Sequence, residues 1–331
     1  MRGRARSPRT WVGLAGLVAL WLAGCASDGA YERAAASDPT ERRGVHPPLA
    51  VAFQYAVENT PTADYFPLEG LSGVAWGEDG MLIMCDSARG RVHALDPRTL
   101  TWSAFDDPGV RPYRPLAARV DGFKVLVLDG SSRAIYRFDL NGAYQDRIVD
   151  LERLDPAYDT APRDFDIDRD GRVVVTDAGE QQVLMLDSFL GLQSRVGNPG
   201  PHREQFDQPA GICFLPDGGF MVADTGNRRL QRFNRLGYGE AVIGGPFDAR
   251  NPFVAPMGVD SDRHGNVYVA DARGVVHVLD GRDQLTMTIG PDQPLESSLL
   301  TPVAVAVGPD GKLAVADRER AAVLVFRLLY E

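Results

Sequence analysis

The sequence predicts an all-β fold, a six-bladed β-propeller, and three observations lead to that prediction. Six aspartates each end a short apolar strand, and the steps between them are 43, 48, 47, 47 and 46 residues. A repeat in the mid-forties that holds about four short strands is what one propeller blade requires. An Asp-Gly or His-Gly pair recurs in one register ahead of each aspartate, which is typical of a hairpin turn. The six aspartates are Asp86, Asp129, Asp177, Asp224, Asp271 and Asp317.

The fourth repeat shows the elements of one unit most clearly. Its four strands are expected at 211–215, 220–223, 229–233 and 240–243. The turn at 216–219 reads PDGG, and proline and glycine supply the backbone angles that such a tight turn needs.

This unit resembles the NHL repeat. The resemblance rests on GNPG at 197–200, QFDQP at 205–209 and DTGNRR at 224–229. Repeat two, from Arg119 to Phe138, is degenerate and lacks one residue before its aspartate. The resemblance covers nearly all of residues 49–331 and implies a six-bladed propeller of NHL repeats.

Ring closure follows from counting strands in the last repeat. Strands are expected at 303–307, 313–316 and 322–328, and the sequence then reaches Glu331 without a fourth. The alternating apolar segment 49–57 is left over at the other end. We expect it to supply the missing outer strand and to cover an edge that would otherwise invite aggregation.

The first 24 residues are interpreted as a lipoprotein signal peptide. Arg2 to Arg9 holds four arginines, and Trp11 to Leu22 is a short apolar run, too short to span a bilayer stably. LAGC at 22–25 resembles the lipobox of bacterial lipoproteins, which implies lipidation of Cys25. The alternative is an ordinary cleaved signal peptide with an incidental cysteine.

Residues 25–48 are then the lipidated cysteine and a flexible tether, because the segment is polar, rich in alanine and charge, and ends in two prolines. A lipid on Cys25 would anchor the protein to a membrane without crossing it. Ala26 stands where inner-membrane lipoproteins usually carry aspartate, so the resemblance points to an exported protein on the bacterial outer membrane.

Charge argues against nucleic acid as a partner. Removing residues 1–24, which hold four arginines and no acids, takes the formal charge from −10 to −14, and lysine occurs only at positions 124 and 312. An acidic chain repels phosphate backbones. The densest basic cluster is expected to pair with neighbouring acids along a strand edge; it comprises Arg228, Arg229, Arg232 and Arg235.

The two remaining cysteines are expected to be buried and reduced. Cys85 lies in the first repeat and Cys213 in the fourth, which are opposite one another in a ring of six. Their Cα atoms should be far beyond the reach of a disulfide.

The six repeated aspartates are interpreted as structural turn caps. An aspartate that ends a strand before a turn accepts hydrogen bonds from backbone N–H groups of that turn. Because one such residue stands in each blade around the ring, the six cannot converge on one metal ion.

Enzymes on related six-bladed propellers, such as sugar-lactone hydrolases, place metal ligands at the mouth of the central channel. In each repeat a leucine or proline stands fourteen or fifteen residues before the aspartate. The residue that follows this leucine or proline is the one expected at the channel mouth. Calcium needs six or more oxygen ligands, and catalytic zinc usually needs three protein ligands. The six residues at this position are Ser72, Leu116, Arg163, Ala210, Met257 and Val303. They do not supply such ligands, so we expect no metal, no cofactor and no catalytic residue.

The histidines do not supply the missing ligands. His93 and His277 fall on third strands, away from the channel, and His46, His202 and His264 fall in the tether, a connection and a turn. Each is more typical of a packing or surface histidine.

Arg163 and Ser72 are the candidate ligand-binding residues. An arginine among apolar neighbours at a channel mouth could hold a small carboxylate or phosphate through two hydrogen bonds. The alternative for Arg163 is an ion pair with Asp164, Asp166 or a neighbouring loop acid. Ser72 has no placed histidine partner and is not in a Gly-x-Ser-x-Gly elbow, so nucleophilic chemistry is not expected.

Two functions remain open. The favoured one is a non-catalytic binding or scaffold lipoprotein whose loops contact a protein partner, and the alternative is a hydrolase of a sugar lactone, phosphoester or related anion at the channel mouth. Aromatic side chains are favoured interface anchors, although each could instead cap a blade core. The aromatics on the longer connections are Phe105, Tyr113, Tyr158, Phe247 and Phe253.

Overall fold

The computed structural model describes residues 46–58, 68–105, 108–109, 113–154, 156–157, 159–290 and 297–330. The chain separates into residues 1–41 and residues 42–331, and every described residue belongs to the second unit. The predicted signal peptide, Cys25 and most of the predicted tether therefore lie outside the described residues. Within the described part, no helix has the length and apolar character needed to cross a membrane.

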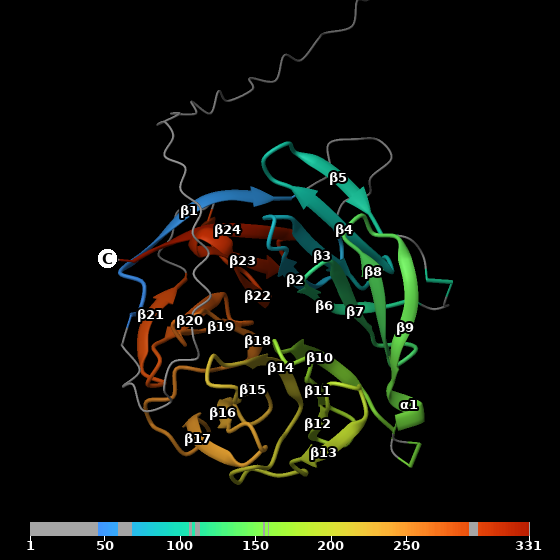
Figure 1. Ribbon diagram of the computed structural model, residues 1–331. Helices are drawn as coiled ribbons and strands as arrows, with labels where there is room; N and C mark the ends of the chain where they lie inside the picture. The colour runs from blue at the N-terminus through green and yellow to red at the C-terminus, as the bar shows by residue number, and fades with distance from the viewer. Residues whose placement is uncertain are drawn as a thin grey trace, which may run out of the picture. The chain divides into compact units, whose positions relative to one another are not determined.

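Six antiparallel four-stranded sheets form the fold, which confirms the predicted six-bladed propeller (Figure 1). The first three sheets contain β2 (Leu71–Trp76), β3 (Leu82–Asp86), β4 (Arg91–Asp96) and β5 (Thr101–Ala104); β6 (Pro115–Asp121), β7 (Lys124–Asp129), β8 (Ala134–Asp139) and β9 (Tyr144–Asp150); and β10 (Pro162–Ile167), β11 (Val173–Asp177), β12 (Gln182–Leu186) and β13 (Leu192–Val196). The fourth and fifth contain β14 (Pro209–Phe214), β15 (Phe220–Asp224), β16 (Arg229–Phe233) and β17 (Gly239–Gly244); and β18 (Pro256–Ser261), β19 (Val267–Asp271), β20 (Val275–Leu279) and β21 (Leu285–Ile289).

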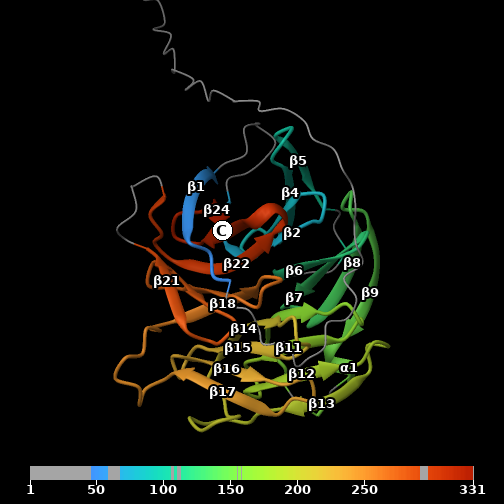
Figure 2. The same ribbon diagram turned by 60° about the vertical axis from the view of Figure 1, so that its left-hand side comes forward.

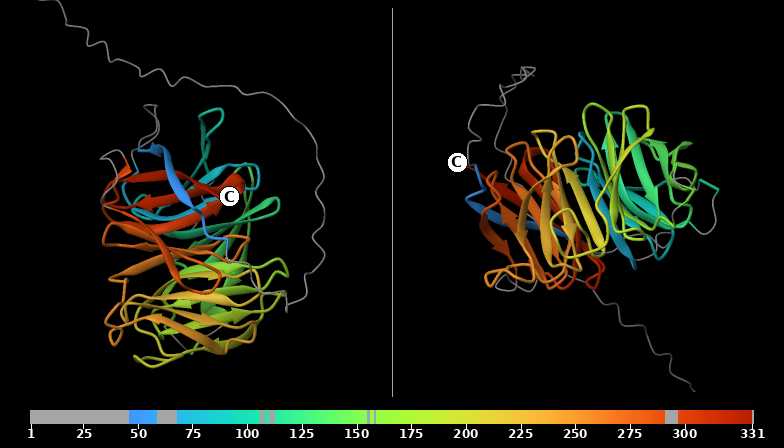
Figure 3. Two further views of the ribbon diagram at one scale, coloured as in Figure 1. Left: turned by 90° about the vertical axis from the view of Figure 1, so that its left-hand side faces the viewer. Right: turned by 90° about the horizontal axis from the view of Figure 1, so that it is seen from below.

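The sixth sheet combines strands from both ends of the described chain. Its order is β1-β24-β23-β22, and it contains β22 (Pro302–Gly308), β23 (Lys312–Asp317), β24 (Ala322–Leu329) and β1 (Ala50–Val57). β1 pairs antiparallel with β24, from Ala50 opposite Leu329 to Val57 opposite Val323. Figures 2 and 3 show blue β1 beside red β24 from two further directions. Helical pieces among the described residues include α1 (Leu151–Leu154), after β9, and a 3₁₀ turn (Pro309–Gly311) between β22 and β23.

The first strand of every blade lies innermost. β2, β6, β10, β14, β18 and β22 contact one another in that order, and β22 contacts β2, so they surround a central channel. Because successive strands of a blade run antiparallel, the turns between first and second and between third and fourth strands emerge on one side, named here the hairpin face. The remaining turns and the links between blades emerge on the opposite side, the connection face. β1 begins on the hairpin face, since Ala50 lies opposite the last residue of β24.

Burial explains the sequence pattern of the strands. The second and third strands of a blade are covered by neighbouring blades on both sides, so β15 and β16 are buried at every position. The outer strand β17 is covered on one side and alternates instead. Between blades three and four, the rings of Phe220 and Phe233 stack with centroids 5.0 Å apart. Burying each such side chain contributes roughly 1.5–3 kcal/mol to folding.

The register of the first hairpin sets the channel geometry. In blade three Pro162 pairs with Asp177, and the equivalent pair recurs in every blade. In repeat two Pro115 pairs with Asp129 in the same way, although one residue fewer separates them, because the turn between β6 and β7 is shorter. The equivalent residues of all six first strands therefore stand at equivalent heights in the channel.

Candidate functional site

The six repeated aspartates are fully buried and tie each incoming connection to its blade. The Asp271 carboxylate accepts hydrogen bonds from the backbone N–H groups of Val254 (2.7 Å), Ala255 (3.0 Å) and, in the following turn, Arg273 (3.1 Å). The connection residues were not expected as donors. Equivalent backbone donors to the other five are Gly70, Arg114, Ala161, Asp207 and Thr301.

The densest basic cluster is largely neutralised. The Arg229 Nε donates to the buried Asp224 carboxylate (2.7 Å), and Arg232 donates to Asp217 and Asp283 (2.8 Å each). Arg235 pairs with Asp170 at 2.8 Å. Three of the four arginines are therefore engaged with acids, as the sequence predicts for a strand edge.

The six predicted channel-mouth residues line one cavity. It has a volume of about 100 Å³ and opens on the connection face, where the first strands begin. Four of the six side chains that line this mouth are apolar, so water and ions meet mostly hydrocarbon there. The six residues are Ser72, Leu116, Arg163, Ala210, Met257 and Val303.

Arg163 lies at this mouth without an acid partner among the described residues. Its guanidinium donates one long hydrogen bond, 3.4 Å, to the side-chain oxygen of Gln208. Asp164 and Asp166, the acids expected to pair with it, are held by Arg119 instead. The alternative, an ion pair of Arg163 with Asp164, Asp166 or a neighbouring loop acid, is not formed among the described residues.

Ser72 bridges two blades at the same mouth. Its hydroxyl donates to the carbonyl of Pro115 (2.9 Å) in blade two and lies 3.3 Å from the carbonyl of Cys85 in its own blade. Because a hydroxyl carries one proton, this donor is already used inside the protein.

A second polar group, which the sequence reasoning missed, lies further along the first strands, and two of its members, Arg119 and Asp164, line the same cavity. Arg119 on β6 donates through Nε to Asp166 (3.0 Å) and through Nη2 to Asp164 (3.1 Å), both on β10. It also donates to the carbonyls of Ala118 (2.9 Å) and Ile212 (3.3 Å). The sequence pattern marks Arg119 only as the start of the degenerate second repeat.

The carboxylates of this interior cluster satisfy backbone groups of the next blade. Asp166 accepts the N–H of Phe214 in blade four, and Asp260 on β18 accepts the N–H of Val307 in blade six, each at 2.7 Å. First strands leave such groups unpaired on their channel side, and an unpaired buried N–H is costly. The interior acids therefore have a structural role that needs no ligand.

Electrostatics inside the channel follow from this arrangement. Burial raises the pKa of Asp260 to about 7; the charge of Arg119 opposes the shift and that of Asp166 adds to it. Burial lowers the pKa of Arg119, but Asp164, Asp166 and Asp260 more than reverse this, and the net pKa is raised. Arg119 therefore remains a permanent cation.

A second arginine at the mouth also escaped the sequence reasoning. Arg318 follows β23 directly, lines the same cavity as Arg163, and donates through Nε to the carbonyl of Leu71 at 3.2 Å. Burial lowers the pKa of Arg318, and the positive charge of Arg163 lowers it further.

The mouth does not offer the ligands of a divalent cation. In the part of the chain that the structure describes, no group of three or more His, Cys, Asp or Glu side chains is placed to hold a metal. The charged side chains at the mouth include two arginines, which repel a cation, and the acids below them are bonded to Arg119. Calcium or zinc chemistry does not fit these residues.

The buried histidines and cysteines lie where the sequence places them. His93 on β4 and His277 on β20 pack against Trp102 and Phe253, and burial lowers the pKa of both histidines. Both are therefore neutral at pH 7. Cys85 and Cys213 are buried free thiols, as predicted, and burial raises the pKa of Cys85 to about 12.

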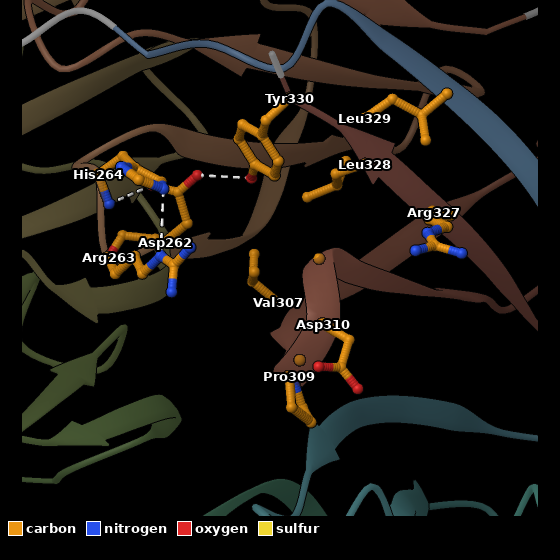
Figure 4. A pocket seen from close by; sticks show the side chains of 13 residues that line it. Asp262, Arg263, His264, Val307, Pro309, Asp310, Arg327, Leu328, Leu329 and Tyr330 are labelled. Atoms are coloured by element: carbon orange, nitrogen blue, oxygen red, sulfur yellow. Dashed lines mark hydrogen bonds between the residues drawn. The ribbon is translucent and has the colours of Figure 1, made fainter. Parts of the chain in front are cut away.

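A larger cavity, about 560 Å³, lies outside the channel on the hairpin face (Figure 4). Figure 4 shows Asp262, Arg263 and His264 on one side and Asp310 and Arg327 across the opening. The carboxylate of Asp262 accepts the Tyr330 hydroxyl at 2.9 Å. Charges of both signs line this cavity, so it does not select a ligand of one sign.

The aromatics of the connections mostly face the interior. Phe105 packs on Phe138 with centroids 5.3 Å apart, Tyr113 is nearly buried, and Phe253 is buried against His277. They cap blade cores, which was one of the two interpretations, while Phe247 is 88% exposed and Tyr158 lies outside the described residues.

Large exposed apolar side chains instead gather on the hairpin face. Phe123 is 86% exposed in the turn between β6 and β7, and Phe189 is 91% exposed in the turn between β12 and β13. Leu100, Leu236 and Tyr238 are exposed in turns of blades one and four on the same face. These residues belong to turns of four different blades, and exposed aromatic side chains are available there as interface anchors.

Comparison with known proteins places the chain among six-bladed propellers. The profile of the family described as "SMP-30/Gluconolactonase/LRE-like region" matches residues 72–312. In sequence, the chain is 30% identical over 149 residues to human E3 ubiquitin-protein ligase NHLRC1, which covers 44% of this chain and 36% of that protein. The chain thus spans about a third of the length of this curated relative.

Solved structures share the fold at low identity. A gluconolactonase from Xanthomonas campestris superposes with a TM-score of 0.60 and 19% identity over 87% of this chain and 99% of that one. Regucalcin from Agrobacterium tumefaciens, a calcium-binding protein, gives 0.61 and 16% over 84% and 95%. At this identity the likeness concerns the fold alone.

Proposed function

The chain belongs to the SMP-30/gluconolactonase/LRE-like family, and on this premise we propose that it is a membrane-anchored, non-catalytic binding lipoprotein that presents one propeller face to a protein partner. The observation that carries the proposal is the exposure of Phe123 and Phe189, in turns of blades two and three, on the hairpin face. Aromatic side chains that fill pockets of a partner dominate many interfaces. The curated relative, named as an E3 ubiquitin-protein ligase, matches this chain over 36% of its own length, which is compatible with a role in protein interaction.

Site-specific photo-crosslinking in native membranes tests this surface. A photoreactive phenylalanine analogue would replace Phe123 in one variant and Phe247 in another. The two side chains are almost equally exposed, 86% and 88%, and lie on opposite faces, so Phe247 is a matched control. A defined protein adduct at position 123 and none at 247 supports the proposal. Adducts at neither position, in membranes that retain the protein, would refute it.

For the anchor, we propose that residues 1–24 are removed and that lipid on Cys25 holds the protein in the outer membrane. Support comes from the four arginines, the apolar run and the LAGC sequence at 22–25. Replacing Cys25 by serine should release the protein into the soluble fraction and abolish incorporation of labelled fatty acid. Retention of the variant in membranes would contradict lipid anchoring, and sedimentation with inner membranes would contradict the location.

For the ring itself, we propose that β1 acts as the closing strand. Its pairing with β24 covers an edge of the sixth sheet, and Val57 packs into the core beside that sheet. Deleting residues 49–57 should yield aggregated protein without a cooperative unfolding transition. A soluble variant with an unchanged melting temperature would remove this role.

A second candidate function is hydrolysis of a sugar lactone, phosphoester or related anion at the channel mouth. The description of the matched family includes gluconolactonase, and the mouth carries Arg163. Assays of lactone and phosphoester hydrolysis, with and without added calcium or zinc, separate the two candidates. Turnover that disappears in an Arg163→Gln variant would favour the hydrolase over the binding protein.

A further inference from the structure

Two arginines line one small cavity at the channel mouth, and the charge of one acts on the other. Arg163 stands near the start of β10 in blade three, and Arg318 follows β23 in blade six, which is opposite blade three in the ring. Both line the same cavity at the channel mouth, together with apolar side chains such as Leu116 and Met257. The ion pair between Arg119 and Asp164 also lines this cavity, and it carries no net charge. The arrangement concentrates positive charge at one point of an otherwise acidic chain.

Neither mouth arginine is neutralised by an acid among the described residues. Arg163 donates to Gln208, and Arg318 donates to the carbonyl of Leu71, so each has only a neutral acceptor. The channel acids nearest to them are bonded to Arg119 and to backbone N–H groups of the next blade. Burial and the charge of Arg163 both lower the pKa of Arg318, so the two like charges oppose one another at this opening. An anion between them would remove that repulsion.

We propose that the channel mouth binds a small anion, a phosphate or a carboxylate, between the guanidinium groups of Arg163 and Arg318. Guanidinium groups match the geometry of both anions and can donate two parallel hydrogen bonds to each. The cavity of about 100 Å³ has room for roughly three water molecules, so it holds a single phosphate or carboxylate group. The rest of a larger ligand would extend beyond the mouth on the connection face.

A site of this kind has the opposite charge preference to a metal site. Regucalcin is a calcium-binding protein with the same fold, but here the mouth offers two arginines and apolar side chains. The Ser72 proton is already donated to backbone carbonyls, so the two arginines are the main donors. The inference does not depend on the proposed protein partner, whose surface is on the opposite face.

Isothermal titration calorimetry of the purified full chain with inorganic phosphate and, separately, malonate tests the site. Wild type, Arg163→Gln, Arg318→Gln and the control Arg98→Gln would be compared at low ionic strength. Arg98 is exposed on the hairpin face and pairs with Asp96, so its loss should leave binding unchanged. We expect one equivalent bound by wild type, and binding at least about tenfold weaker in either mouth variant, which corresponds to about 1.4 kcal/mol.

Circular dichroism spectra of the variants would show that each is folded. Stronger binding of phosphate than malonate would identify a phosphate ligand, and the reverse order a carboxylate. No binding of either anion by wild type, or equal binding by wild type and both mouth variants, would overturn the proposal. The photo-crosslinking result at Phe123 would be unaffected by either outcome.

Discussion

Arginines occupy two levels of the same channel in opposite electrostatic situations. Arg119, in the interior, donates to two carboxylates and two backbone carbonyls. Arg163 and Arg318, at the mouth, share a cavity and have only neutral acceptors among the described residues. The difference teaches that acid partners decide the role, because Arg119 has two carboxylates within hydrogen-bond distance and the two mouth arginines have none among the described residues.

The largest expected effect comes from breaking the interior. Replacing Arg119 by methionine leaves Asp164 and Asp166 without their cation in a site where both are largely buried. Removing one member of a buried ion pair typically costs about 3–5 kcal/mol, so we expect a loss of that size at pH 7. The loss should be smaller at pH 5, where the carboxylates can take up protons. Urea unfolding at both pH values measures it; a loss below about 1 kcal/mol at pH 7 would contradict the account.

A smaller effect is expected from Asp260, whose pKa burial raises to about 7. An aspartate in an unfolded chain has a pKa of about 3.9. Between these values the folded state holds a proton that the unfolded state has released, so stability falls as pH rises to about 7 and is level above it. In Asp260→Asn this decline between pH 5 and 8 should shrink by roughly 1–3 kcal/mol.

Thermal or urea unfolding of wild type and Asp260→Asn across that pH range checks the prediction. Parallel curves for the two proteins would show that Asp260 does not titrate with the expected pKa. Arg119 and Asp166 face the same carboxyl group, so the Arg119→Met variant provides a second comparison.

The smallest effect on stability is expected at the mouth. Replacing Arg163 or Arg318 by glutamine should change the free energy of unfolding by less than about 0.5 kcal/mol in anion-free buffer, as is usual for exposed side chains. In phosphate buffer, wild type should gain stability that neither variant gains, because a ligand that binds only the folded state stabilises it. A loss above about 2 kcal/mol in anion-free buffer would mean that these arginines hold the fold together.

The sequence predicted the mouth well because a single pairing determines it. Pro162 pairs with Asp177, and the same pair recurs in each blade, so one offset located all six mouth residues. A second set of equivalent residues stands three positions after the mouth residue of each repeat. These residues are Ala75, Arg119, Asp166, Cys213, Asp260 and Ala306. Three of these residues, Arg119, Asp166 and Asp260, are charged, and charge at this position could have predicted the interior cluster.

Other features could not be read from the repeat alone. Arg318 follows its aspartate where the other repeats carry Ser87, Gly130, Ala178, Thr225 and Ala272, so its charge is unusual, but only the folded ring brings it to Arg163. The partner of Arg119 likewise depends on contact between blades, because an interior side chain can reach either its own neighbours or the next strand. Exposure of Phe123 and burial of Phe253 depend on how tightly each loop packs.

Equilibrium dialysis of the wild-type protein against labelled calcium and, separately, labelled phosphate tests the central claim most directly. The account predicts about one equivalent of phosphate, lost when Arg163 and Arg318 are both replaced by glutamine, and no stoichiometric calcium. One equivalent of calcium with no bound phosphate would show that the channel mouth is a cation site despite its two arginines.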